Sequence, residues 1–330
     1  MTFLEKQFKG DKYYYYLTKT IRLEDNKYKK IRHFVEASEK ELTKAEEEVL
    51  KLFHIDEFES ILEEHLPVTK RTDFDCDVFF EDEWPIYSDE DLKDINIIQK
   101  KYKKLKKTDN QDYLDKIEQQ FIIRHSYDTN KVEGSSFTLE ETEALLTKGL
   151  VTEPHLQREI FEITNIRDGF EYIMEYKGEL SNNFIRRLHK IITKNTLKYP
   201  DTEGKYRTKG LNVGMGGSEY KTVPGGHVKS AMDELITGFN KFYKNDKLGA
   251  IVRFYSGFIA VHPFTDGNGR VSRMILNWLL IQNSLPPINF RDDKHMQHVK
   301  FLEMSRSSNG HEPLGQFILN RIKLNVWTNR

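Results

Sequence analysis

Apolar residues recur with helical spacing along most of the C-terminal two thirds of the chain. The run over 251–261 is apolar on nearly every side, and the run over 271–279 follows it after a short polar loop. Spacings of three and four residues predict helices over 248–262 and 269–283. A helix that is apolar all round belongs in a core, so we expect this pair at the centre of the fold.

Residues 110–134 have the same helical spacing, with Ile117 and Phe121 on one side. Gly134 suits the end of this helix, because glycine adopts the left-handed backbone that often closes one. Thr138, followed by acidic residues, reads as the N-cap of another helix. A further helix is expected over about 292–307.

Period-two alternation appears in one short stretch of this region. Leu211 and Val213 alternate against Tyr220 and Thr222, with the glycine-rich segment 214–217 between them. This pattern predicts a β-hairpin. The glycines do not form a phosphate loop of the G-K-S/T type, because that sequence does not follow them.

The first part of the chain has a different composition. Residues 1–32 hold nine lysine or arginine residues against four acidic ones, and four consecutive tyrosines at 13–16 lie among them, which reads as a strand or hairpin. Residues 36–66 read as helical. We therefore expect a mainly α protein, with an α/β extension over 1–109 and a helical domain over 110–330.

Composition and charge argue against several functional classes for this chain. The net charge is -1 over 330 residues, so overall basicity does not favour nucleic acid. No apolar run approaches the ~18 residues that cross a membrane, and residues 1–6 lack a signal-peptide core. The single cysteine, Cys76, is typical of a reducing cytoplasm.

The loop between the two apolar helices has the composition of a phosphate site. Gly267 and Gly269 flank Asn268, at the point where the second helix begins. A helix N-terminus attracts anions, and glycines let the backbone approach them. Arg270 and Arg273 lie three residues apart on one helix face, and their forked guanidinium groups suit phosphate oxygens.

Two residues beside this loop suggest catalysis. Asp266 offers the hard oxygen that Mg²⁺ prefers. His262 ends the first apolar helix, and its ordinary pKa range suits a general base near neutral pH. A histidine or an Asp-Gly pair alone is usually structural. The combination within twelve residues favours a nucleotide site.

The whole stretch from His262 to Arg273 resembles, position for position, the signature H-P-F-x-D/E-G-N-G-R-x-x-R of the Fic (filamentation-induced-by-cAMP) family. The resemblance implies a Fic-type helical bundle with a small β-hairpin flap, and transfer of AMP from ATP to a protein hydroxyl with Mg²⁺. It implies that His262 is the general base, Asp266 the metal ligand and Phe264 a buried anchor of the loop. It also implies that Gly267, Asn268 and Gly269 form an anion hole, and that Arg270 and Arg273 bind the phosphates.

A second motif resembles the inhibitory motif S/T-x-x-x-E-G/N of the same family. Thr129, Glu133 and Gly134 match it, at the end of the helix expected over 110–134. The resemblance implies that Glu133 pairs with Arg273 and blocks the γ-phosphate. Such a charged pair contributes roughly 1.5–3 kcal/mol. A plain helix end followed by an N-cap is the alternative interpretation.

The resemblance also suggests partners. Leu211, Asn212 and Val213 would form the flap on which an extended protein segment docks, and the protein itself is one candidate target. Relatives often place a tyrosine pair against adenine, where this chain has His298 and Val299. ATP remains the expected nucleotide, with His298 as a candidate contact. A change of homo-oligomeric state would be one way to relieve inhibition.

Several alternatives stay open from the sequence. The same site suits removal of AMP from a modified protein, or transfer of another nucleotide. A nucleotide-sensing module without transfer belongs to a different class. Binding of nucleic acid by the basic, aromatic segment 1–32 is the least favoured alternative.

Overall fold

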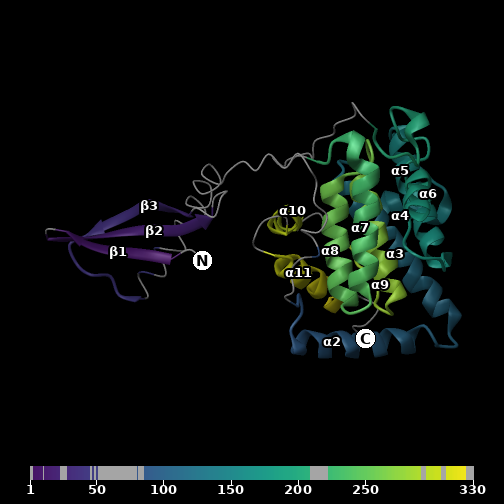
Figure 1. The fold of residues 1–330 in the computed structure, drawn as a ribbon. Helices are drawn as coiled ribbons and strands as arrows, with labels where there is room; N and C mark the ends of the chain where they lie inside the picture. Colours follow the sequence, from purple (N-terminus) through teal and green to yellow (C-terminus); the bar gives the residue numbers. More distant parts are fainter. Residues whose placement is uncertain are drawn as a thin grey trace. The chain divides into compact units, whose positions relative to one another are not determined.

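The computed structural model describes residues 3–9, 11–22, 28–44, 47, 50, 80, 85–208, 222–290, 295–305 and 310–324. The chain divides into two compact units, Met1–Asp73 and Phe74–Arg330. Both units are drawn in Figure 1.

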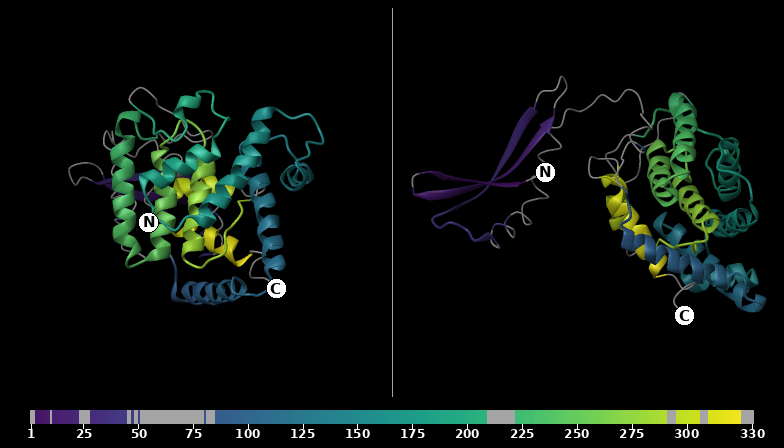
Figure 2. Two further views of the ribbon diagram at one scale, coloured as in Figure 1. Left: turned by 90° about the vertical axis from the view of Figure 1, so that its right-hand side faces the viewer. Right: turned by 60° about the horizontal axis from the view of Figure 1, so that its bottom comes forward.

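The N-terminal unit contains a three-stranded antiparallel sheet in the order β1-β2-β3. Its strands are β1 (Phe3–Lys9), β2 (Lys12–Arg22) and β3 (Tyr28–Ser38), drawn as purple arrows in Figure 2. Tyr15 and Leu17 are fully buried, whereas Phe34 is 50% exposed. The sheet extends beyond the strand or hairpin expected in 1–32, because its third strand runs to Ser38. The helix expected over 36–66 therefore does not begin at 36, and most of that segment lies outside the described residues.

The second unit is helical, in agreement with the expected bundle. Its elements are α2 (Asp89–Leu105), α3 (Gln111–Val132), α4 (Leu139–Lys148), α5 (Gln157–Glu175), α6 (Asn182–Ile192), η3 (Pro200–Thr202), η4 (Gly225–His227), α7 (Val228–Tyr243), α8 (Lys247–Val261), α9 (Asn268–Gln282), α10 (His295–Met304) and α11 (Glu312–Lys323).

Helices α8 and α9 form the centre of this unit (Figure 1). Every residue of α8 from Gly249 to Val261 is buried, and so is nearly all of α9. Helix α8 packs against α7 and α9, while α5 packs against α3, α6 and α9. The loop 262–267 therefore starts and ends on two helices that the core holds in place.

Local sequence explains where several helices begin. Asp246 caps α8 by accepting a hydrogen bond from the Gly249 backbone N–H at 2.8 Å. Thr138 and Glu141 form a capping box at the start of α4. These caps satisfy N–H groups that the first helical turn leaves without partners. The observed α8 and α9 lie within one residue of the expected helices 248–262 and 269–283.

Helix α2 belongs to the second unit, although the sequence boundary was expected after it, between 109 and 110. Its buried residues Ile95, Ile98 and Tyr102 join the main core. The expected flap, with Leu211, Asn212 and Val213, lies outside the described residues. Among the helices that the structure describes, none is long and apolar enough to cross a membrane.

Candidate active site

The loop between α8 and α9 turns sharply at both of its ends. His262 has φ 52° and Gly267 has φ 78°, both in the left-handed region. That conformation is uncommon for a residue other than glycine, so His262 is held there by its surroundings. Phe264 is fully buried, and its ring stacks on that of His189 with 3.7 Å between centroids. The loop is thus anchored in the core, as expected for Phe264.

The side chain of Asn268 holds the same loop closed. Its Oδ1 accepts a hydrogen bond from the Phe264 N–H, and its Nδ2 donates one to the Phe264 carbonyl, both at 2.9 Å. Any contribution of Asn268 to an anion hole therefore comes from its backbone N–H.

The start of α9 has the properties of an anion site. Gly267 is the N-cap and has no side chain with which to close the first turn. A Cβ atom on Gly267 would lie 2.7 Å from Thr193 Cγ2, and one on Gly269 would lie 2.8 Å from Glu133 Oε1. Gly267 is therefore sterically required, because its neighbour is a short side chain, whereas the neighbour of Gly269 is the end of the flexible Glu133 side chain. The Glu133 carboxylate thus lies against the Gly269 backbone.

Arg273 joins this helix to the end of α3. Its Nε donates to Thr129 Oγ1 at 2.7 Å, and its Nη2 donates to Glu133 Oε1 at 2.7 Å. Thr129 is buried, whereas the Glu133 side chain is 38% exposed. Burial alone would raise the pKa of Glu133, but the guanidinium groups of Arg273 and Arg270 outweigh it and lower that pKa. The carboxylate is thus charged and paired, at the edge of the anion site.

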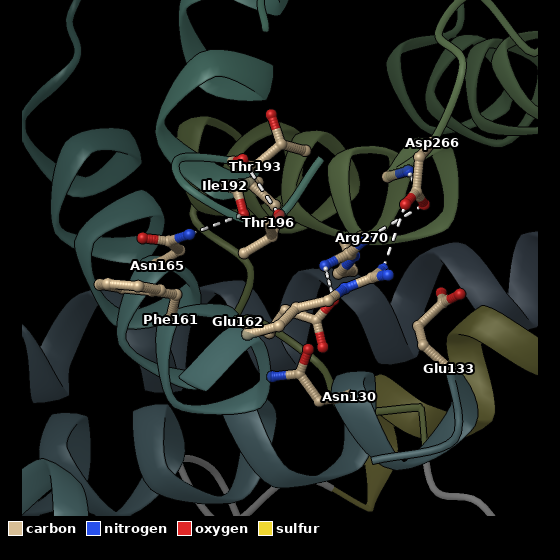
Figure 3. A network of polar contacts seen from close by, with 12 residues as sticks. Asn130, Glu133, Phe161, Glu162, Asn165, Ile192, Thr193, Thr196, Asp266 and Arg270 are labelled. Carbon is tan, nitrogen blue, oxygen red and sulfur yellow. Dashed lines mark hydrogen bonds and ion pairs between the residues drawn. The ribbon is translucent and has the colours of Figure 1, made fainter. Parts of the chain in front are cut away.

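Asp266 and Arg270 form the other side of the site. Asp266 Oδ1 accepts from the Gly267 N–H at 2.6 Å and from Arg270 Nη2 at 3.2 Å. Arg270 Nη1 donates to Glu162 Oε1 at 3.2 Å. Figure 3 shows Glu162, Arg270 and Asp266 in a row, with Glu133 beside them. Arg270 itself is 2% exposed, so two carboxylates fix its position.

Helix α5 contributes two residues that the sequence did not single out. Arg158 Nε donates to Glu162 Oε1 at 2.9 Å, and its Nη2 donates to Asp266 Oδ2 at 3.3 Å. With Arg270, these residues close a ring of two arginines and two carboxylates. The i,i+4 spacing of Arg158 and Glu162 was the available signal, but solvated helix faces carry the same pattern.

His189 holds the Asp266 end of the loop through hydrogen bonds. Its Nδ1 accepts from the Gly204 N–H at 2.8 Å, so its Nε2 carries the proton and donates to the Asp266 carbonyl at 3.1 Å. Burial lowers the pKa of His189 to about 4. The ring is therefore neutral at pH 7, in one tautomer, and it fixes the backbone at Asp266.

Arg207 holds the start of the loop. Its guanidinium donates to the carbonyls of His262 at 2.7 Å, Val223 at 2.8 Å and Val261 at 3.1 Å. The backbone N–H of Arg207 donates to the Pro263 carbonyl at 2.8 Å. This buried arginine satisfies carbonyls at the end of α8, where the helix leaves them without partners. The sequence shows an arginine shortly before the expected flap, but it does not show which carbonyl groups this arginine contacts.

His298, expected as a candidate nucleotide contact, lies in the core of the second unit. It is 3% exposed, and its Nε2 lies 2.9 Å from Tyr255 Oη. Its ring stacks on Phe317 and packs against Phe290. Direct contact with a nucleotide base requires access that this burial does not provide.

The site suits a magnesium ion bound together with phosphates. Asp266 is a carboxylate with 42% of its side chain exposed, beside the helix N-terminus. Mg²⁺ in nucleotide sites takes one or two carboxylates, with phosphates and water completing its shell. In the described part of the chain, no group of three His, Cys, Asp or Glu residues could hold a metal by itself.

Comparisons with known proteins identify the same region. Residues 179–280 match the model of the Fic/DOC family. Protein adenylyltransferase fic-1 of Caenorhabditis briggsae is 26% identical over 169 residues, which cover 49% of this chain and 32% of that protein. Protein adenylyltransferase Fic of Nematostella vectensis is 24% identical over 187 residues, covering 52% and 41%. The chain thus spans less than half the length of these curated relatives.

Solved structures share the fold. A Fic-domain-containing signalling protein from Bacteroides thetaiotaomicron has a TM-score of 0.60 at 21% identity, over 69% of this chain and 93% of that one. Fic-1 (residues 134–508) of C. elegans has a TM-score of 0.60 at 20% identity, over 71% and 69%. The match to the family model, over residues 179–280, contains the loop 262–267 together with Arg270 and Arg273. Residues 179–280 are therefore similar to the Fic/DOC family, and the second unit has the fold of these Fic structures.

Proposed function

We propose that this protein is an adenylyltransferase that transfers AMP from ATP to a Ser, Thr or Tyr hydroxyl of a protein. The observation that carries the proposal is the open N-terminus of α9, flanked by Asp266, Arg270 and Arg273, with His262 at the other end of one rigid loop. The names of the curated relatives support the same reaction.

The mechanism follows from the roles these groups can fill. His262 accepts the proton of the target hydroxyl, whose oxygen attacks the α-phosphorus in line as pyrophosphate leaves. The N–H groups at the start of α9 and the guanidinium of Arg270 stabilise the charge on the phosphates. Asp266 would hold Mg²⁺, which neutralises phosphate charge when bound. Positioning by the packed loop supplies the rest of the acceleration.

We further propose that the resting enzyme is autoinhibited by Glu133. Its carboxylate pairs with Arg273 at 2.7 Å and lies against Gly269, where a phosphate would approach the helix N-terminus. While this pair persists, Arg273 is not available to the γ-phosphate. Because the Glu133 side chain is 38% exposed, solvent screens the pair and the inhibition should be moderate.

The target is proposed to be a protein segment that adds as a strand to a flap containing Leu211, Asn212 and Val213. The enzyme itself is one candidate substrate, and a change of homo-oligomeric state is a candidate trigger. We place the reaction in the cytoplasm, because the chain has a single cysteine.

The test is self-modification with ATP and Mg²⁺, read as added AMP by intact mass. Glu133→Gly should modify itself about tenfold faster than the wild type, since one screened charged pair is lost. Glu133→Gly combined with His262→Ala should gain no AMP. Glu118→Gln is the control, because Glu118 lies on α3 and pairs with Lys106, outside the site.

Other results would redirect the assignment. ATP binding by Glu133→Gly without any transfer, to itself or to added cell protein, would identify a nucleotide-sensing module. Loss of AMP from a modified substrate, faster with Glu133 present than without it, would identify AMP removal as the reaction. Labelling by GTP, CTP or UTP in preference to ATP would change the nucleotide.

A further inference from the structure

We infer that Arg158 competes with Mg²⁺ for Asp266. By this competition it raises the magnesium concentration that the site needs to bind ATP. The inference rests on the proposed function and concerns a residue of α5 outside the signature motif. It starts from the ion pair between Arg158 Nη2 and Asp266 Oδ2, at 3.3 Å.

The two oxygens of Asp266 have different partners. Oδ1 is held by the Gly267 N–H at 2.6 Å and by Arg270, which is buried and fixed. Oδ2 accepts from Arg158, whose side chain is 53% exposed. An exposed contact of this length is weak and exchanges readily with solvent. Oδ2 is therefore the oxygen that a metal can take without disturbing the loop.

Glu162 keeps Arg158 beside the site after such an exchange. Arg158 Nε lies 2.9 Å from Glu162 Oε1, closer than its contact with Asp266. The same oxygen accepts from Arg270 Nη1 at 3.2 Å, and the Glu162 side chain is 10% exposed. Arg158 can thus release Asp266 while it remains anchored to its own helix, one turn away from Glu162.

Charge explains why the exchange depends on magnesium. Arg158 and Arg270 balance the carboxylates of Glu162 and Asp266, so the ring is neutral as it stands. A divalent ion at Oδ2 would meet the positive charge of Arg158 at short range, and the two cations repel. Arg158 and Mg²⁺ therefore compete for the same carboxylate oxygen. Removing Arg158 should make the metal easier to bind.

The test measures ATP binding, by calorimetry, over a series of free Mg²⁺ concentrations. Glu133→Gly is the parent, so that the proposed inhibitory pair does not contribute. Adding Arg158→Gln should lower the half-saturating Mg²⁺ concentration about two- to fivefold, the range of a surface ion pair. Arg158→Lys keeps the charge and should stay near the parent. Arg167→Gln is the matched control, since Arg167 lies on α5 and pairs with Asp168.

The possible results distinguish a failure of the proposed role of Arg158 from a failure of the proposed function. If the parent binds ATP but Arg158→Gln leaves the Mg²⁺ requirement unchanged, or raises it, the competition is wrong and the proposed function stands. If the parent fails to bind ATP at every Mg²⁺ concentration, the nucleotide site is wrong and the inference falls with it. An equal shift in Arg167→Gln would reduce the effect to net charge and overturn the role of Arg158.

Discussion

At the scale of single residues, the site depends on a glycine whose lack of a Cβ atom lets the backbone pack closely. Gly267 combines a left-handed backbone, φ 78°, with a close approach to Thr193. Gly149 has a similar φ of 67°, but a Cβ atom there would meet nothing within 4 Å. The two positions therefore separate backbone strain from steric clash.

Gly149→Ala should lower the free energy of unfolding by about 1 kcal/mol, the strain of a left-handed alanine. Gly267→Ala should lower it by about 2–3 kcal/mol, because the new methyl group also meets Thr193 Cγ2. Adding Thr193→Ser removes that carbon and keeps the hydroxyl, which donates to the His189 carbonyl. Urea denaturation measures all three. If Thr193→Ser restores nothing, the clash is not the cause.

At the scale of elements, α3 and α9 meet at their ends. The last turn of α3 brings Thr129 and Glu133 to Arg273, which lies one turn inside α9. Thr129 is buried and Glu133 is not, so the threonine contact is the better shielded of the two. The relative position of the two helices thus decides whether Arg273 is held.

Thr129→Val removes the acceptor for Arg273 Nε and leaves that buried N–H without its partner. We expect a loss of about 1–2 kcal/mol in stability, with self-modification about two- to fivefold faster because Arg273 is less firmly held. Thr142→Val is the control, since Thr142 is equally buried and bonds to the Thr138 carbonyl on α4. The control should lose stability without a change in rate. Equal rates in both variants would rule out a role for Thr129 in holding Arg273.

At the scale of the whole molecule, two buried histidines link folding to pH. Burial lowers the pKa of both His125 and His189 to about 4. In the unfolded chain their pKa is about 6.5. Between these values the unfolded state binds more protons, so the free energy of unfolding falls as the pH falls.

Each histidine should cost about 2 kcal/mol of stability between pH 7 and pH 5. His125→Gln should therefore reduce the pH-dependent loss by about 2 kcal/mol, whatever its effect at pH 7. His227→Gln is the control, because that residue is exposed. Urea midpoints of each variant and the wild type, measured at pH 7 and pH 5, give the loss. An undiminished loss in His125→Gln would mean that other groups carry the dependence.

The sequence by itself determined the helices and the chemistry of one continuous stretch. The apolar pattern predicted α8 and α9 to within one residue, and the order of residues from His262 to Arg273 indicated a phosphate site, because both depend on neighbours along the chain. It also pointed to Glu133, through a second short motif.

Only the tertiary structure decided which distant residues complete the site. Thr129 and Arg273 are 144 residues apart, and Glu162 and Arg270 are 108 apart. Their pairing depends on how α3, α5 and α9 pack, and no local spacing encodes it. For the same reason His298, on an unremarkable helix, proved to be a core residue: burial is a property of the packed fold, whereas a motif is a property of the chain.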